Sequence, residues 1–410
     1  MKRLLIGALG LALGAAPAIA QSLEDLNIQI HGYATEGLLY TTQNNVFTTD
    51  SSDGSPAWTE VVLNVTAQPM PKLRVGMQGR YFLLGNIGNN ISLDWAEADY
   101  KQNDYFGFRF GKVKTPIGLF NEIQDIDPAY NFALLPQSVY DILSRTTWLT
   151  HLGGVAYGSA RIGSTKQKLE YRIWGGQQVE LPNDPNIMLG LEGTGISLPN
   201  GWTGPMLGAA LHYKPTPSFM IGASNTFFRT TWSAQAKWQL PSSITLPGGT
   251  VLPAGTILQG TNGTPPSQLP YYFAKYEKDK VMVAYEYMRN QYLSFYIWPT
   301  EPLLNSSFRA DQRSWYAMGT YKVTGKLTAG LYDSQSIDHQ QPLSVSGSPN
   351  YARYSKDWTV NARYDFNSYI YAKFDEHFIS GTELDYDTAL NPNGIEPTTK
   401  LMILKIGVTF

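Results

Sequence analysis

The 410-residue chain contains no cysteine and little charge, since charged residues make up only 16% of it. Without cysteine the chain cannot form disulfide bonds. Histidine is also rare, and the five copies are too scattered along the chain to predict a zinc site. The 31 basic and 33 acidic residues give a formal net charge of −2, which predicts no nucleic-acid partner.

Long apolar runs are scarce as well. Leu4–Ala16 is apolar, and nothing else in the chain approaches the ~20 apolar residues that a membrane-spanning helix needs. This segment follows two basic residues, is broken by Pro17, and precedes Ala18-Ile19-Ala20, which is typical of a cleavage site. We therefore expect residues 1–20 to be a cleaved signal peptide rather than a membrane anchor. Residues 21–410 would then form a single exported domain.

What the chain does have is tyrosine, with 26 copies, and a regular alternation of apolar and polar residues. The alternation is clear in the segments Leu73–Tyr81, Lys168–Ile173 and Trp358–Phe366. A period of two predicts β-strands with one apolar and one polar face. A length of about ten residues matches a tilted strand that crosses a bilayer with its apolar face toward lipid.

The connections between such segments are of two kinds, which alternate along the chain. Short turns are expected at residues 69–72, 102–104, 163–167, 214–218, 279, 324–325 and 367. Long loops are expected at residues 41–57, 85–90, 113–149, 180–204, 230–267, 299–311, 336–354 and 380–398. In the fifth of these loops, a repeat of Leu-Pro and Gly-Thr from Leu246 to Ile257 predicts a hairpin.

This arrangement predicts an all-β fold: a closed antiparallel transmembrane β-barrel of about 16 strands, with short periplasmic turns and long extracellular loops. Closure would leave no strand edge unpaired in lipid. A soluble β-sandwich or propeller is the alternative. The propeller is disfavoured because no repeat of blade length is present.

The polar strand faces would form the wall of an aqueous pore. The predicted pore-wall residues are Arg74, Arg80, Arg109, Arg172, Lys275, Glu277, Glu286, Lys322, Arg363, Asp365, Lys373 and Asp375. With Lys405, Glu170 and Asp357 added, nine basic residues stand against six acidic ones. This small excess would favour anions mildly, and a mixed-charge wall with little selectivity is the alternative.

The stretch from Lys114 to Asp141 does not alternate. It is too apolar for a loop left in water, so we expect this third long loop to fold into the barrel and constrict it. The predicted constriction residues are Lys112, Lys114, Asn121, Glu122, Asp125, Asp127 and Arg145. The acids are interpreted as partners of basic wall residues that hold the loop, or alternatively as a filter for solute.

Two chemical alternatives concern the same stretch. A hydrolase would need a nucleophile with a base, and the nearby combinations are Ser144 with His151 and Asp125 with Asp127. Neither lies in a recognisable catalytic motif. A calcium site at Asn121, Asp125 and Asp127 would lack the glycine and the remaining acids of a calcium loop. No catalytic residue, metal or cofactor is therefore predicted.

The run FGKVKTPIGLFNE at residues 110–122, followed by LLPQSVYD at residues 134–141, resembles the porin-like family of Gram-negative outer-membrane barrels that includes the phosphate-selective porins. The resemblance implies a sixteen-stranded barrel, usually a homotrimer, that passes small hydrophilic solutes by diffusion. The loop itself departs from a phosphate filter. Three bases (Lys112, Lys114, Arg145) against four acids (Glu122, Asp125, Asp127, Asp141) give it a formal charge of −1.

The chain ends with alternating apolar residues from Leu404 to Phe410. This ending looks like the assembly signal that the barrel-insertion machinery recognises, with Phe410 as its last residue. We therefore expect a non-enzymatic porin of the bacterial outer membrane, in contact with outer-membrane lipid and lipopolysaccharide. The alternatives are a substrate-specific channel with a binding site for a small anion or organic acid, and a barrel enzyme or surface adhesion protein.

Overall fold

The computed structural model describes residues 26–85, 87–163, 166–229, 234–340, 350–384 and 390–410. The predicted signal peptide, residues 1–20, lies outside the described residues. Within the described ranges, no helix is both long enough and apolar enough to cross a membrane.

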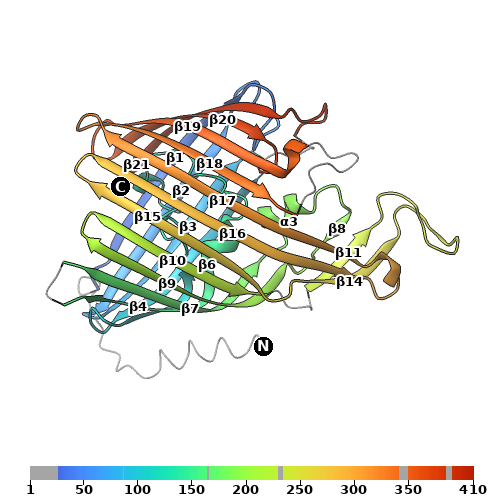
Figure 1. Cartoon of the computed structure of the whole chain (residues 1–410), viewed down its shortest axis with the longest axis horizontal. Coiled ribbons are helices and arrows are strands. Elements are labelled where there is room, and N and C mark those ends of the chain that lie inside the picture. The colour runs from blue at the N-terminus through green and yellow to red at the C-terminus, as the bar shows by residue number, and fades with distance from the viewer. Residues whose placement is uncertain (1–25, 86, 164–165, 230–233, 341–349, 385–389) are drawn as a thin grey trace.

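Sixteen strands of the described chain form a closed antiparallel barrel (Figure 1). They are β1 (Gln29–Thr41), β2 (Ser55–Met70), β3 (Leu73–Leu84), β4 (Gly88–Lys101), β5 (Gly107–Lys114), β6 (Thr150–Arg161), β7 (Lys168–Glu180), β9 (Trp202–Thr216), β10 (Phe219–Phe228), β15 (Ser267–Lys278), β16 (Val281–Ile297), β17 (Ser306–Lys322), β18 (Leu327–Asp338), β19 (Tyr354–Asp365), β20 (Ile370–Gly381) and β21 (Thr398–Thr409). The first and last strands pair from Tyr33↔Thr409 to Thr41↔Leu401, which closes the sheet. The predicted barrel is confirmed.

Alternation along each strand separates an inward from an outward face. On β16, Ala284, Glu286 and Met288 are buried on the inner side, while Val283 and Tyr285 are 49% and 45% exposed on the outer side. Contact with lipid favours such an apolar outer face, and the pairing of the first and last strands leaves no open sheet edge in the barrel.

Several outer connections differ from their predicted lengths. Only residues 85–87 separate β3 from β4, so the prediction of a long loop at 85–90 was wrong. The reason is that Asn89 and Asn90 continue the ladder opposite Leu83 and Phe82. The sixth outer loop is also shorter than predicted, with η2 (Pro302–Leu304) in it, because β16 and β17 run for 17 residues each.

Beyond the barrel, three short strands from the outer loops continue the barrel sheet. β8 (Ile196–Ser197), β11 (Ala234–Gln239) and β14 (Ile257–Gly263) extend it from the long-loop end of β16. A cluster around Leu240, Leu258 and Trp298 stabilises it, and α3 (Pro185–Gly190) packs there through Ile187. The predicted hairpin is confirmed as β12 (Ile244–Thr245) paired with β13 (Val251–Leu252).

Candidate functional site

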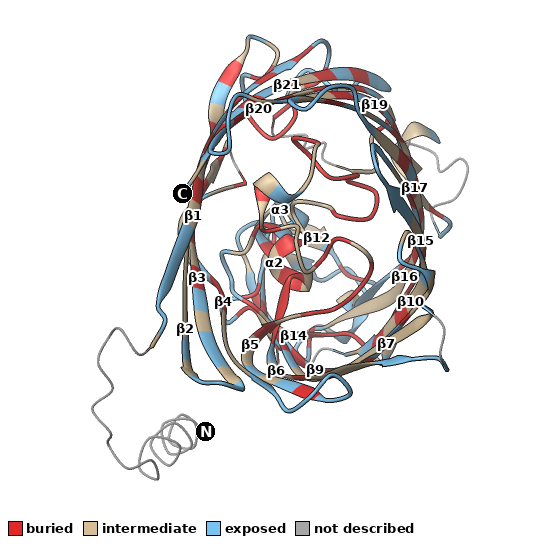
Figure 2. Cartoon of the chain, turned by 90° about the vertical axis from the view of Figure 1, so that its left-hand side faces the viewer, coloured by how far each residue is buried: buried red, intermediate tan, exposed pale blue. Residues whose placement is uncertain are grey.

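Residues 115–149, between β5 and β6, form a segment inside the barrel that we call the inner loop (Figure 2). It contains two short helices, η1 (Asp127–Ala129) and α2 (Arg145–Trp148). η3 (Asn350–Arg353) completes the short helices of the described chain. Side-chain contacts with the wall, described next, place the inner loop across the lumen.

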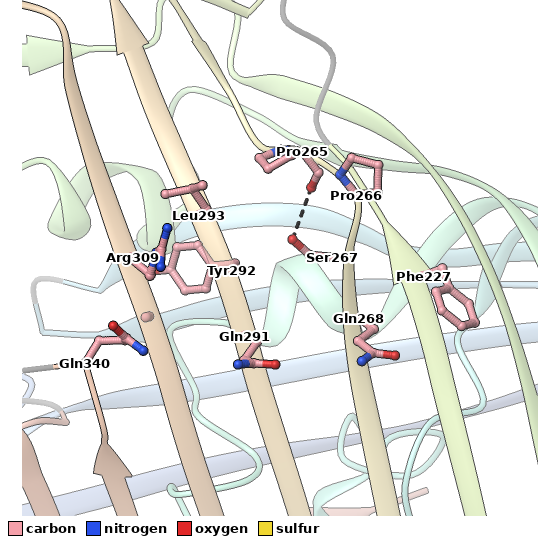
Figure 3. A pocket seen from close by; sticks show the side chains of 11 residues that line it. Phe227, Pro265, Pro266, Ser267, Gln268, Gln291, Tyr292, Leu293, Arg309 and Gln340 are labelled. Carbon is pink, nitrogen blue, oxygen red and sulfur yellow. Dashed lines mark hydrogen bonds between the residues drawn. The ribbon is translucent and has the colours of Figure 1, made fainter.

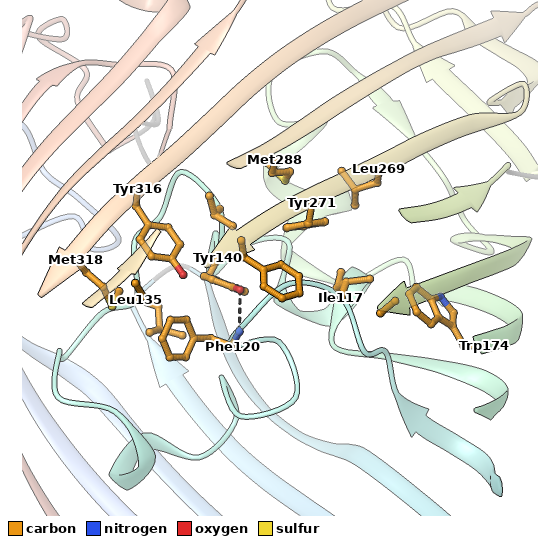
Figure 4. Packing of buried hydrophobic residues seen from close by; sticks show 14 of the residues in the cluster. Ile117, Phe120, Leu135, Tyr140, Trp174, Leu269, Tyr271, Met288, Tyr316 and Met318 are labelled. Carbon is orange, nitrogen blue, oxygen red and sulfur yellow. Dashed lines mark hydrogen bonds between the residues drawn. The ribbon is translucent and has the colours of Figure 1, made fainter. Parts of the chain in front are cut away.

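The apolar residues of the inner loop pack against the barrel wall. Ile117, Phe120 and Leu135 join one buried cluster with Trp174 of β7 and Tyr316 of β17 (Figure 4). Their burial removes from water the apolar surface that the sequence places in this loop. The loop therefore has a hydrophobic reason to lie inside the barrel.

The first polar anchor is Asp127, which is fully buried at the start of η1. Its Oδ1 lies 2.6 Å from Nζ of Lys405 on β21, and its Oδ2 lies 3.0 Å from Nζ of Lys373 on β20. The hydroxyl of Tyr371 donates to Oδ2 at 2.6 Å. Burial alone would raise the pKa of Asp127, but the two ammonium groups outweigh it and hold the pKa well below its ordinary value.

The second anchor is Glu286 on β16, on another side of the barrel wall. Its carboxylate accepts hydrogen bonds from the Leu119 backbone N–H at 3.0 Å, the Tyr140 hydroxyl at 2.6 Å and the Tyr316 hydroxyl at 2.8 Å. The preceding Gly118 has a φ of +60°, and a Cβ there would lie 2.2 Å from Oε1 of Glu286. Only glycine allows the loop to approach the carboxylate this closely.

A third set of contacts is partly exposed. Oε1 of Glu122 lies 2.9 Å from Nη1 of Arg109, and its Oε2 lies 3.3 Å from Nε of Arg172. The side chains of Glu122, Arg109 and Arg172 are 27%, 23% and 24% exposed. Burial would raise the pKa of Glu122, but Arg172 and Arg109 lower it below its ordinary value. All three side chains therefore remain in partial contact with water.

Two further ion pairs hold the loop to β3, β4 and β5. Asp125 accepts from Lys114 Nζ at 2.7 Å and from Gln78 Nε2 at 2.8 Å. Arg145 of α2 donates to both oxygens of Asp94, at 2.9 and 3.3 Å. Asp125, Asp94 and Arg145 are buried and the Lys114 side chain is only 13% exposed, so these charges largely neutralise one another within the protein.

No protein-family model and no curated protein sequence matches this chain. Solved structures do match it. The complex of Salmonella typhi OmpF with daunomycin has a TM-score of 0.59 at 12% identity, covering 95% of this chain and 99% of that one. The chain has the porin fold.

Two other solved structures agree with this conclusion. OmpT, an outer membrane protein of Vibrio cholerae, has a TM-score of 0.53 at 11% identity, with 96% of this chain and 100% of that chain covered. The anion-selective porin from Comamonas acidovorans has a TM-score of 0.50 at 9% identity, with 94% and 99% covered. At such identities the likeness concerns the fold.

Within this porin fold, the predicted pore-wall residues lie on the inward faces of their strands. Arg363, for example, donates to the backbone oxygens of Pro128 and Tyr130 in the inner loop. Lys275 and Glu277 share a face of β15 with the buried Tyr271 and pair with each other at 2.7 Å. By the same alternation Arg74, Arg80, Arg109, Arg172, Glu286, Lys322, Asp365, Lys373 and Asp375 face inward.

The predicted constriction residues do not all belong to the inner loop. Lys112 and Lys114 are part of β5, because the ladder with β6 continues as far as Lys114↔Thr150. Nζ of Lys112 donates to the backbone oxygen of Leu93 at 2.5 Å and meets none of the loop acids in the contacts of the described chain. Asn121 ties the two ends of the loop together, donating to the backbone oxygens of Thr115 and Trp148.

Sequence reasoning missed several acids that pair with the loop or its neighbours. Glu60 precedes the outward-facing Val61 on β2 and shares the inward face with Val62. Alternation alone would therefore have placed Glu60 inward. Asp94 was hidden for a different reason. The ladder between β3 and β4 shifts near Gln78, where a bulge breaks the period of two at Asp94.

The combinations considered for catalysis and metal binding are kept apart by the fold. The Ser144 hydroxyl donates to Asp141, whereas Nδ1 of His151 lies 3.0 Å from the Thr115 hydroxyl. Asp125 and Asp127 bind different basic residues. Among the described residues, no group of three or more histidines or acids is arranged to hold a metal ion.

Proposed function

We propose that this chain forms a water-filled channel in the bacterial outer membrane, through which small hydrophilic solutes or ions diffuse passively. The inner loop is the proposed constriction. The observation that carries the proposal is its attachment to separate parts of the wall: Asp127 to β20 and β21, and Leu119 to Glu286 on β16. A loop held at both places narrows the lumen permanently instead of opening and closing as a lid.

The proposed filter lies where charge remains accessible to water. Arg109, Arg172 and Glu122 are the charged residues that a solute would meet beside the inner loop. Because the two arginines share one loop carboxylate and Arg109 also lies 3.6 Å from Asp99, the local charges nearly balance. We therefore propose weak ion selectivity with a mild preference for anions.

The proposed assembly is a homotrimer in contact with outer-membrane lipid and lipopolysaccharide. One solved structure similar to this chain is a trimer form of Vibrio cholerae OmpT, with a TM-score of 0.51. Cleavage after residue 20 and recognition of Phe410 by the barrel-insertion machinery are part of the same proposal. Phe410 pairs through its backbone with Gly32 of β1, at the seam of the barrel.

A second candidate function is a channel specific for a small anion or organic acid. It is favoured by a cavity of about 40 Å³ beside the inner loop, lined among others by Arg80, Arg145 and Lys405. These three cations already pair with Glu60, Asp94 and Asp127. A bound carboxylate would have to compete with these partners, so passive diffusion is the better-supported function.

The decisive experiment is conductance in a planar lipid bilayer. Purified protein should insert in discrete steps in simple salt, and Asp127→Asn should change the step size because it releases one anchor of the constriction. Asp279→Asn, in an exposed short turn, is the matched control and should leave conductance unchanged. The absence of steps would refute the channel and favour an enzyme or an adhesion protein. Saturation of the current by one organic acid would favour the specific channel.

A further inference from the structure

The outward face of β10, β15, β16 and β17 changes from apolar to polar residues between the short-turn end and the long-loop end of the strands. On β16, Val281 and Val283 at the short-turn end are followed by Tyr285 and Tyr287, and then by Arg289. The rings of Tyr285 and Tyr287 stack on those of Trp315 and Tyr272 from the neighbouring strands. Polar residues then continue the same face, namely Asn225, Gln268, Gln291, Arg309 and Arg313.

This change occurs near the height at which a bilayer ends. Arg289 is eight residues beyond Val281, the first residue of β16. With a rise of about 3.4 Å per residue and a tilt of about 40°, Arg289 lies roughly 20 Å above the short-turn end. The apolar band of outer-membrane barrels is about 25 Å tall and is bordered by aromatic residues. Arg289 and the opposite Arg313 therefore lie just below the long-loop border of this band, and their long side chains can reach the level of the lipid headgroups.

Two of the arginines share one buried acid. Arg289 and Arg313 are directly opposite each other in the ladder between β16 and β17. Two like charges in such a position repel each other and would destabilise the pair if no acid lay between them. Asp311 lies 2.7 Å from Arg289 and 3.0 Å from Arg313, and only 5% of its side chain is exposed. The arginine side chains remain 36% and 42% exposed. The cluster thus presents one net positive charge outward.

A depression of the surface accompanies this charge. A hollow of about 300 Å³ is lined by Gln268, Pro270, Tyr287, Arg289 and Gln291, among others. Gln268 and Gln291 also line an adjoining hollow of about 490 Å³, which Arg309 borders (Figure 3). Proline lacks a backbone N–H, so Pro270 within β15 interrupts the ladder beside the hollow.

We propose that this depression binds the phosphorylated sugar headgroup of a lipopolysaccharide molecule in the outer leaflet. Arginine matches phosphate oxygens through charge-assisted, often bidentate hydrogen bonds. The amides of Gln268 and Gln291 supply donors and acceptors for sugar hydroxyls, and the aromatic rings below them border the acyl chains. This inference rests on the proposed outer-membrane location, but not on conductance through the lumen.

The test uses the purified full chain and native mass spectrometry with diphosphorylated lipid A as the probe. Wild type should retain lipid A and release its dephosphorylated form. The double variant Arg289→Gln/Arg313→Gln should retain about tenfold less, because two charge-assisted contacts are lost. Lys278→Gln is the matched control, since Lys278 lies on the same outward face of β15 but at the short-turn end.

Two further variants test whether a loss of binding could come from misfolding, and whether added positive charge strengthens binding. Arg309 is exposed and has no ion pair within the described chain, so Arg309→Gln should fold normally and weaken retention to a smaller degree. Asp311→Asn should strengthen retention, because it frees both arginines for phosphate. Circular dichroism verifies the fold of each variant.

Equal retention of lipid A and its dephosphorylated form by wild type would overturn the proposal, as would undiminished binding by the double variant and Arg309→Gln. A change of oligomeric state in the double variant with lipid binding unchanged would also overturn it, in favour of a contact between copies. Conductance is measured on the same preparations. Its absence from wild type would count against the channel and leave the lipid result intact.

Discussion

Two acids of the inner loop, Asp127 and Glu122, lie five positions apart in the sequence and in different environments. Asp127 is fully buried and contacts two lysines and a tyrosine. Glu122 is 27% exposed and contacts two arginines that also reach water. Buried ion pairs are costly to break, whereas exposed pairs contribute little to stability. The comparison separates a residue that holds the loop from one that can meet solute.

The largest expected effect comes from Asp127→Asn. The variant leaves the ammonium groups of Lys373 and Lys405 buried without a counter-charge, which should cost about 3–5 kcal/mol in the free energy of unfolding. Urea unfolding of the detergent-folded protein measures it. Asp104→Asn, whose side chain is 81% exposed at a short turn, is the control and should be nearly neutral. Equal stability of Asp127→Asn and wild type would show that Asp127 is not an anchor.

Glu286→Ala tests the other anchor. It removes the acceptor for the Leu119 N–H and for two tyrosine hydroxyls, all in a buried environment. An unsatisfied buried donor costs about 1–3 kcal/mol, so we expect a loss of roughly 2–3 kcal/mol and larger current fluctuations in bilayers. Glu286→Gln keeps one acceptor oxygen and should lose less. A quiet channel in Glu286→Ala would contradict a role in holding the loop.

Acid should weaken the first anchor. The pKa of Asp127 is depressed in the folded protein, so its contribution to stability is complete above its unfolded pKa of about 3.9 and is lost as pH falls below that value. Wild type should therefore lose stability below about pH 4 more steeply than Asp127→Asn does. Unfolding measured from pH 7 to pH 2 gives the two slopes, and identical slopes would exclude Asp127 as the source.

The smallest effect on stability is expected for Glu122→Gln, at most about 1 kcal/mol, since the pair is partly exposed. Its effect on selectivity should be larger, because Arg109 and Arg172 lose the loop carboxylate that they share. The reversal potential in a salt gradient should shift toward anions. An unchanged reversal potential together with a large loss of stability would reverse the roles assigned to Glu122 and Asp127.

Much of the barrel could be predicted because its signals are local. A period of two along β19, and turns such as the one at Asp279, depend on residues close in sequence. The prediction failed where a local pattern is interrupted or continued unexpectedly. The bulge near Asp94 concealed an inward acid, and the ladder through Asn89 and Asn90 replaced a predicted loop.

The candidate site could be predicted only in part. The apolar character of Ile117, Phe120 and Leu135 already required that the loop find a surface to cover it. Its partners could not be read from the same stretch. Asp127 meets Lys373 and Lys405 at separations of 246 and 278 positions, which only closure of the barrel brings together.

By itself, the sequence determined the strand pattern, the positions of most turns and the presence of an apolar, acidic loop, because each follows from neighbouring residues. The tertiary structure alone decided which loop acids are buried. Glu122 and Asp127 are similar carboxylates until the wall surrounds one and leaves the other in contact with water. That difference arises from long-range packing, so it sets the proposed division between anchor and filter.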